Sequence, residues 1–136
     1  MYRMLLLKMF RSNIIMVKIS INEFPIFNQH LFEFIKNKVD SSFSFDFLSQ
    51  NIDITGYCKC GLEGCATVQL ESKINFPHYQ KTTTFYNNQI IQKLHLDDNF
   101  IIREFEYMDK ASTNEAPYKN EIRDIFKQYQ SYEENV

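Results

Sequence analysis

The 136-residue sequence contains no tryptophan and only three glycines, three prolines and three cysteines. So few breaking residues indicate long helices and strands joined by short connections. The three cysteines lie within eight residues, and their number is odd. This arrangement is not typical of a secreted protein held by several disulfides, and it favours a reducing, cytoplasmic setting.

A strong charge of either sign is also missing, since the net charge is −2. Residues 1–39 carry six Lys and Arg against two acids, whereas residues 40–136 carry nine against fifteen. A nucleic-acid-binding protein needs a basic surface, so this mildly acidic chain argues against nucleic acid and suits a basic protein partner. The apolar run Met4–Leu7 ends at Lys8, which is too short for a signal peptide or a membrane span.

What the sequence does contain is enough apolar material for a core. Hydrophobic residues make up 44% and aromatic residues 15% of the chain, which excludes wholesale disorder. The length predicts a single domain. We assign it to residues 13–132, with residues 1–12 as a flexible extension and residues 133–136 as a frayed tail.

The first third of the chain predicts a strand, a helix and a short third element. Apolar and polar residues alternate from Ile14 to Ile21, as in a half-buried strand. Pro25 suits the first turn of a helix, and apolar residues at helical spacing extend that helix to about Val39. Alternation in Phe43–Phe47 predicts a strand, although a helix over Phe43–Gln50 fits the same residues.

The stretch from Ile52 to Ile74 predicts a β-hairpin. Residues Gly61–Gly64 form a four-residue turn with a glycine at each end. Strict alternation would place the residues before the turn on one apolar face. These residues are Ile52, Ile54, Gly56, Cys58 and Cys60.

Three further strands and one helix complete the prediction. The strands are expected at Thr82–Tyr86, Gln89–Leu96 and Phe100–Met108. Pro117 opens the last helix, and its apolar face recurs at spacings of three and four. That face comprises Ile122, Ile125, Phe126, Tyr129 and Tyr132. We therefore predict an α+β fold, with a four- to six-stranded antiparallel meander and an N-terminal and a C-terminal helix packed on it.

The hairpin would bring the three cysteines close together. A tetrahedral zinc site needs four ligands, so Cys58, Cys60 and Cys65 with His78 are a candidate set, and His95 is an alternative fourth ligand. Two other interpretations compete with zinc. The cysteines fit small buried core residues, which the alternation favours, and Cys60 with Cys65 also fits a disulfide across the hairpin.

Catalysis finds little support in the sequence. A catalytic cysteine needs an activating base, and no spacing singles out a histidine for this role. His30 lies within the first predicted helix and fits a boundary position there. Glu104 and Glu106 share one strand face, which is more typical of a solvated surface or of an acidic edge for a basic partner. We expect that the protein is not an enzyme.

The run Cys58-Lys-Cys60-Gly-Leu-Glu-Gly-Cys65-Ala-Thr-Val resembles a CxCGxxGCxTV motif of small bacterial proteins. Some of these resemble immunity proteins of polymorphic toxin systems. The resemblance implies a cytoplasmic protein that neutralises a cognate toxin domain by covering its active site. Such a role needs aromatic anchors and complementary charge. The candidates are Tyr57, Tyr79, Tyr86, Glu104, Glu106 and Tyr107.

Overall fold

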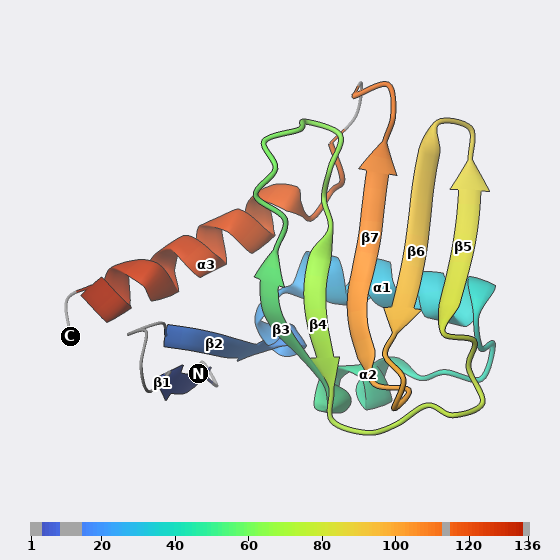
Figure 1. The fold of residues 1–136 in the computed structure, drawn as a ribbon, viewed down its shortest axis with the longest axis horizontal. Coiled ribbons are helices and arrows are strands. Elements are labelled where there is room, and N and C mark those ends of the chain that lie inside the picture. Colours follow the sequence, from blue (N-terminus) through green and yellow to red (C-terminus); the bar gives the residue numbers. More distant parts are fainter. Residues whose placement is uncertain (1–3, 9–14, 113–114, 135–136) are drawn as a thin grey trace.

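The computed structural model describes residues 4–8, 15–112 and 115–134 (Figure 1). In this part of the chain, one antiparallel sheet carries the helices on a single face (Figure 1). The predicted α+β architecture, with an N-terminal and a C-terminal helix packed on the sheet, is confirmed.

The sheet has the strand order β1-β2-β3-β4-β7-β6-β5. Strands β5, β6 and β7 form an antiparallel meander. Strand β7 also pairs with β4 at the centre of the sheet, although the two strands are far apart in the sequence. The strands are β1 (Met4–Lys8), β2 (Ile15–Ser20), β3 (Ile52–Tyr57), β4 (Val68–Ser72), β5 (Thr82–Asn87), β6 (Ile90–Leu96) and β7 (Ile102–Asp109).

Strand β1 comes from the segment that we expected to extend from the domain, and it pairs with β2. Residues 1–3 and 9–12 of that segment lie outside the described residues, as does Ile14, which we expected to begin the first strand. Residues 135 and 136 of the expected tail are also outside the described chain.

The helices are η1 (Ile21–Glu23), α1 (Pro25–Lys38), α2 (Phe45–Asn51) and α3 (Lys119–Glu134). Helix α1 matches the prediction and begins at Pro25. Its first backbone N–H groups find acceptors on α3, because the Glu121 carboxylate accepts bonds from Ile26 N and Phe27 N, each 2.9 Å long. A side chain of the last helix therefore caps the first helix.

The strand predicted at Phe43–Phe47 is wrong, because these residues lead into helix α2. Ser44 caps this helix, and its Oγ accepts a 3.1 Å hydrogen bond from Phe47 N. Leu48 is fully buried against the core. The N-cap and the buried leucine outweigh a local Phe alternation that also fits helical spacing.

The core lies between the sheet and the helices. Phe105 on β7 occupies its centre, with ring centroids 5.1 Å from Phe34 and 6.2 Å from Phe27 of α1. On α3, Ile122, Phe126 and Tyr129 are buried, while Tyr132 has no described side chain. The opposite face of the sheet, which we call the open face, carries none of the described helices (Figure 1).

Candidate metal centre

The cysteine loop, residues 58–67, joins β3 to β4 at one end of the sheet (Figure 1). Strand β3 ends at Tyr57, and a β-bulge between Ile54 and Gly56 breaks the alternation that we predicted. As a result, Cys58 and Cys60 are exposed and do not share the buried face of the isoleucines. The interpretation of these two cysteines as core residues is wrong, and only Cys65 is buried.

The loop brings the three cysteines together. The sulfur atoms of Cys58, Cys60 and Cys65 all lie within 4.8 Å of one another, and all three are free thiols. In a tetrahedral zinc site with Zn–S bonds of about 2.3 Å, the sulfurs are about 3.8 Å apart. Small side-chain rotations are therefore enough to place all three sulfurs on one ion.

The three thiols differ in acidity. The pKa of Cys60 is lowered, chiefly because the backbone N–H of Leu62 donates to its sulfur and the other two thiols also donate to it. The pKa of Cys58 is raised to about 11, first by partial desolvation and then by its hydrogen bonds to the neighbouring thiols. Cys60 is thus the thiol of this pair that more readily becomes a thiolate, the form that binds metals.

Cys65 is held firmly by strand β7. Gly64 O accepts a 2.8 Å hydrogen bond from Asp109 N, and Thr67 Oγ1 accepts a 3.1 Å bond from Tyr107 N. The Cys65 Sγ lies 3.7 Å from the same Thr67 hydroxyl. Hydrogen-bonding neighbours of this kind orient metal ligands, so one of the three sulfurs is positioned in advance.

The start of α3 holds the other side of the loop. The Tyr118 hydroxyl donates a 2.6 Å hydrogen bond to Ala66 O. The Lys119 ammonium donates to Leu62 O at 3.1 Å and to Glu63 O at 2.6 Å. Both side chains are buried, so the loop is attached to the helix through its backbone carbonyls.

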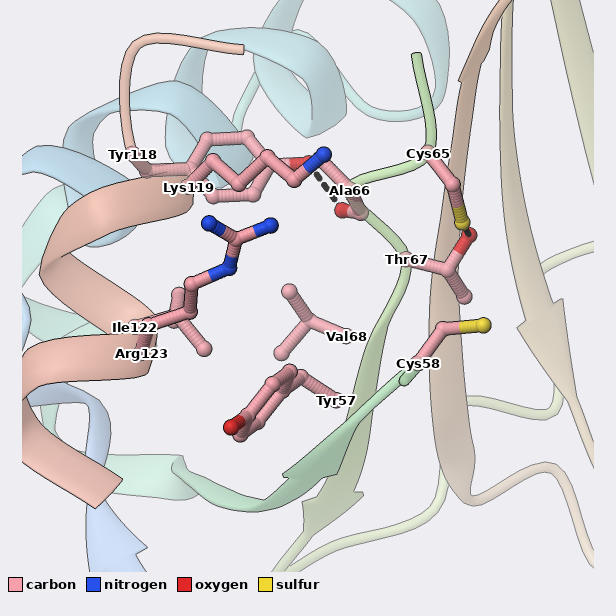
Figure 2. A pocket seen from close by; sticks show the side chains of 10 residues that line it. All are labelled: Tyr57, Cys58, Cys65, Ala66, Thr67, Val68, Tyr118, Lys119, Ile122 and Arg123. Carbon is pink, nitrogen blue, oxygen red and sulfur yellow. Dashed lines mark hydrogen bonds between the residues drawn. The ribbon is translucent and has the colours of Figure 1, made fainter. Parts of the chain in front are cut away.

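Figure 2 shows a small cavity between the cysteine loop and α3. Its volume of about 20 Å³ is enough for a single water molecule. Arg123 extends into this space from α3, whereas the sulfurs of Cys58 and Cys65 lie on the side of the loop away from the helix (Figure 2). A metal ion held by the thiols would therefore lie outside the cavity.

Neither histidine considered as a fourth ligand joins the thiols. His78 lies in the β4–β5 connection at the opposite end of the sheet (Figure 1), where its Nε2 is 3.9 Å from Asp40 Oδ2. His95 lies on β6, with Nε2 2.9 Å from Glu106 Oε1. Within the described residues, the thiol group includes no histidine or carboxylate.

His95, Glu104 and Glu106 form a separate group on the open face, with potential ligand atoms within 4.8 Å of one another. The predicted shared face of the two glutamates is confirmed by their register, since Glu104 lies opposite His95 and Glu106 lies opposite Lys93. Both glutamates are partly accessible.

The connection that contains His78 borders a polar hollow of about 530 Å³. Asp40 is its central acid, and the pKa of this carboxyl is lowered, first by the Ser42 hydroxyl and also by the Tyr79 hydroxyl. Tyr79 donates a 3.0 Å hydrogen bond to Asp40 and is only 7% exposed. Tyr79 is therefore a structural residue of this connection.

The tyrosines predicted as partner anchors differ in accessibility. Tyr79 and Tyr107 are buried, so the prediction that they contact a partner is wrong. Tyr57 is half-buried, with its ring centroid 5.4 Å from that of Phe126. Tyr86 on β5 is 64% exposed and remains available.

Three residues that frame the cysteine loop were missed: Thr67, Tyr118 and Lys119. One signal for Lys119 is present in the sequence. A lysine in the first turn of a helix opposes the helix dipole, so its ammonium needs acceptors elsewhere. The sequence does not indicate which loop provides them.

Comparisons of the chain with protein-family models, with curated proteins and with solved structures found no match. Among the described helices, none has both the length and the apolar character needed to cross a membrane. The chemistry of the cysteine loop and of the open face therefore provides the basis for a function.

Proposed function

We propose that the protein is a non-catalytic binding module whose cysteine loop is stabilised by zinc. The observation that carries this proposal is the convergence of three free sulfurs within 4.8 Å. Thiolates are preferred zinc ligands, and two exposed cysteines gain nothing from core packing. Solvent, or a side chain of a partner, would supply the fourth ligand.

A structural role for the ion fits the surroundings of the loop. Cys65 is anchored by β7, whereas Cys58 and Cys60 lie on the exposed part of the loop. Zinc would join the exposed part to the anchored part and so stabilise the folded loop. Among the described residues, the thiol group includes no histidine or carboxylate that could act as a general base, which supports a role without catalysis.

Cobalt titration of the metal-free protein tests this proposal. We expect a thiolate-to-cobalt charge-transfer band that saturates at about one equivalent and disappears in Cys65→Ser. His78→Gln and His95→Gln are matched controls, because neither histidine lies with the thiols, and both should retain the band. A titration without the band, or a band that survives in Cys65→Ser, would count against a three-cysteine centre.

A second proposal concerns the partner. We propose that the open face binds a basic protein domain, as the resemblance to immunity proteins of toxin systems implies. The supporting observation is that Asp53, Glu104 and Glu106 are partly accessible on the face of the sheet that carries none of the described helices (Figure 1). Glu71 is paired with Lys18 and Arg103, but Asp53 and Glu104 have no lysine or arginine partner among the described residues.

The partner proposal predicts capture of a basic domain that is toxic when expressed alone and harmless when co-expressed with this protein. The double variant Glu104→Lys/Glu106→Lys should lose this partner, since it reverses charge at the centre of the open face. Glu33→Lys on α1 is the matched control and should retain it. Equal capture by the double variant would show that another surface binds.

A further inference from the structure

Lys119 is a buried cation without an acidic partner. The residue is 7% exposed, and within the described residues no carboxylate pairs with it. Its position in the first turn of α3 adds the unfavourable end of the helix dipole. Buried charges are normally compensated, so hydrogen-bond acceptors must take the place of a carboxylate at Lys119.

The two acceptors of this ammonium lie inside the cysteine loop. Leu62 O and Glu63 O, at 3.1 and 2.6 Å from the Nζ, belong to the segment that separates Cys60 from Cys65. Tyr118, one residue earlier, donates to Ala66 O just beyond Cys65. The start of α3 therefore fixes the backbone that sets the distance between an exposed thiol and the buried one.

The sulfurs of Cys58 and Cys65 lie on the side of the loop away from α3 (Figure 2), so Lys119 would act on a zinc centre through the loop carbonyls that it binds and not by contact with the ion. We propose that Lys119 is the positioning residue of the zinc centre and that it links zinc binding to the docking of α3. The inference rests on the zinc centre proposed above and adds the residue and the helix through which the centre acts.

The coupling works in both directions. Zinc would fix the loop carbonyls that Lys119 and Tyr118 bind, and so stabilise the docked helix. Conversely, undocking of α3 would break the hydrogen bonds of Lys119 and Tyr118 to the loop carbonyls, and the loosened loop would bind zinc more weakly. The docked face of α3 also includes Phe126, whose ring centroid lies 6.0 Å from that of Phe24 and 5.4 Å from that of Tyr57.

The test uses the full chain with zinc as the probe. Zinc affinity is measured by competition with a chromophoric chelator, and amide hydrogen exchange of α3 is measured with and without zinc. In the wild type, zinc should slow exchange in α3 more than in α1. Lys119→Met should lower zinc affinity by about 10- to 100-fold, as expected for the loss of a residue that supports metal ligands, and should abolish the effect on α3.

Lys59→Met is the matched control. Lys59 lies between Cys58 and Cys60, and its replacement by methionine removes the same positive charge. The Lys59 ammonium, however, lies over the Tyr57 ring and not against the loop carbonyls. It should retain near wild-type affinity and the zinc effect on α3. If Lys119→Met does not fold, the wild-type exchange measurement still decides the question.

Two results would overturn the inference while leaving the zinc centre intact. One is a wild-type protein that binds zinc without any change in α3 exchange. The other is a folded Lys119→Met protein that binds zinc as tightly as the wild type. A wild-type protein that binds no zinc would instead remove the zinc centre itself, and the inference with it.

Discussion

Replacing Gly64 by alanine should destabilise the protein much more than replacing Gly61. A Cβ on Gly64 would overlap the carbonyl oxygen of Asp109 and lie 3.0 Å from the carbonyl carbon. Both are backbone atoms of β7 and cannot rotate away. The cysteine loop would have to move and lose its 2.8 Å hydrogen bond from Asp109 N to Gly64 O.

The expected magnitude follows from these two effects. Overpacking against a fixed neighbour costs about 1–3 kcal/mol, and a lost hydrogen bond costs about 1 kcal/mol, so Gly64→Ala should lower the free energy of unfolding by about 2–4 kcal/mol. Gly61 has a φ of +81° and open space around it. Gly61→Ala should therefore cost only about 1 kcal/mol of backbone strain.

Urea unfolding of the two variants measures the difference. With an m-value of about 2 kcal/mol/M, Gly64→Ala should lower the unfolding midpoint by about 1–2 M. The comparison should be made on metal-free protein, so that zinc binding does not contribute. Equal midpoints for the two variants would contradict the close approach of the loop to β7.

Three further predictions concern other sites. Tyr118→Phe removes the donor to Ala66 O and leaves a buried carbonyl without its partner, so urea unfolding should show a loss of about 1–3 kcal/mol. Ser42→Ala should raise the pKa of Asp40 toward its ordinary value, since the Ser42 hydroxyl is the largest cause of the lowered pKa, and NMR titration of the carboxyl carbon measures this change. Burial lowers the pKa of His30, so the folded protein holds this imidazole in its neutral form. The resulting contribution to the free energy of unfolding is present above pH about 6.5 and is lost as the pH falls below it. The urea midpoint should therefore decrease below pH about 6.5, and it should decrease less in His30→Gln.

Most of the fold follows from local patterns in the sequence. Pro25 with its helical spacing predicted helix α1, and the strands predicted after residue 81 correspond to β5, β6 and β7. At helix α2 the sequence favoured a strand and kept a helix over Phe43–Gln50 as the alternative, because five alternating residues fit both, and the Ser44 cap decides for the helix. The β4–β7 pairing joins residues far apart in sequence, which no local pattern specifies.

The candidate site could be predicted only in part. A hairpin implies that Cys58, Cys60 and Cys65 come together, and they do. Their exposure depends on the bulge between Ile54 and Gly56, and the pairing of β3 with β4, not the local alternation, determines where that bulge lies. The distance of His78 from the thiols and the contact of Lys119 with the loop both depend on tertiary packing. Lys119 lies 56 residues from Glu63 in the sequence, so no local pattern indicates that the two residues meet.

Zinc content tests the central claim, a zinc ion on the cysteine loop, most directly. The protein is purified under reducing conditions without added metal, and zinc is measured by mass spectrometry beside the Cys65→Ser variant. The proposed centre predicts about one zinc per wild-type chain, almost none in Cys65→Ser, and a lower unfolding temperature after chelation. Less than about a tenth of an equivalent in the wild type, with thermal unfolding unchanged by added zinc, would contradict it.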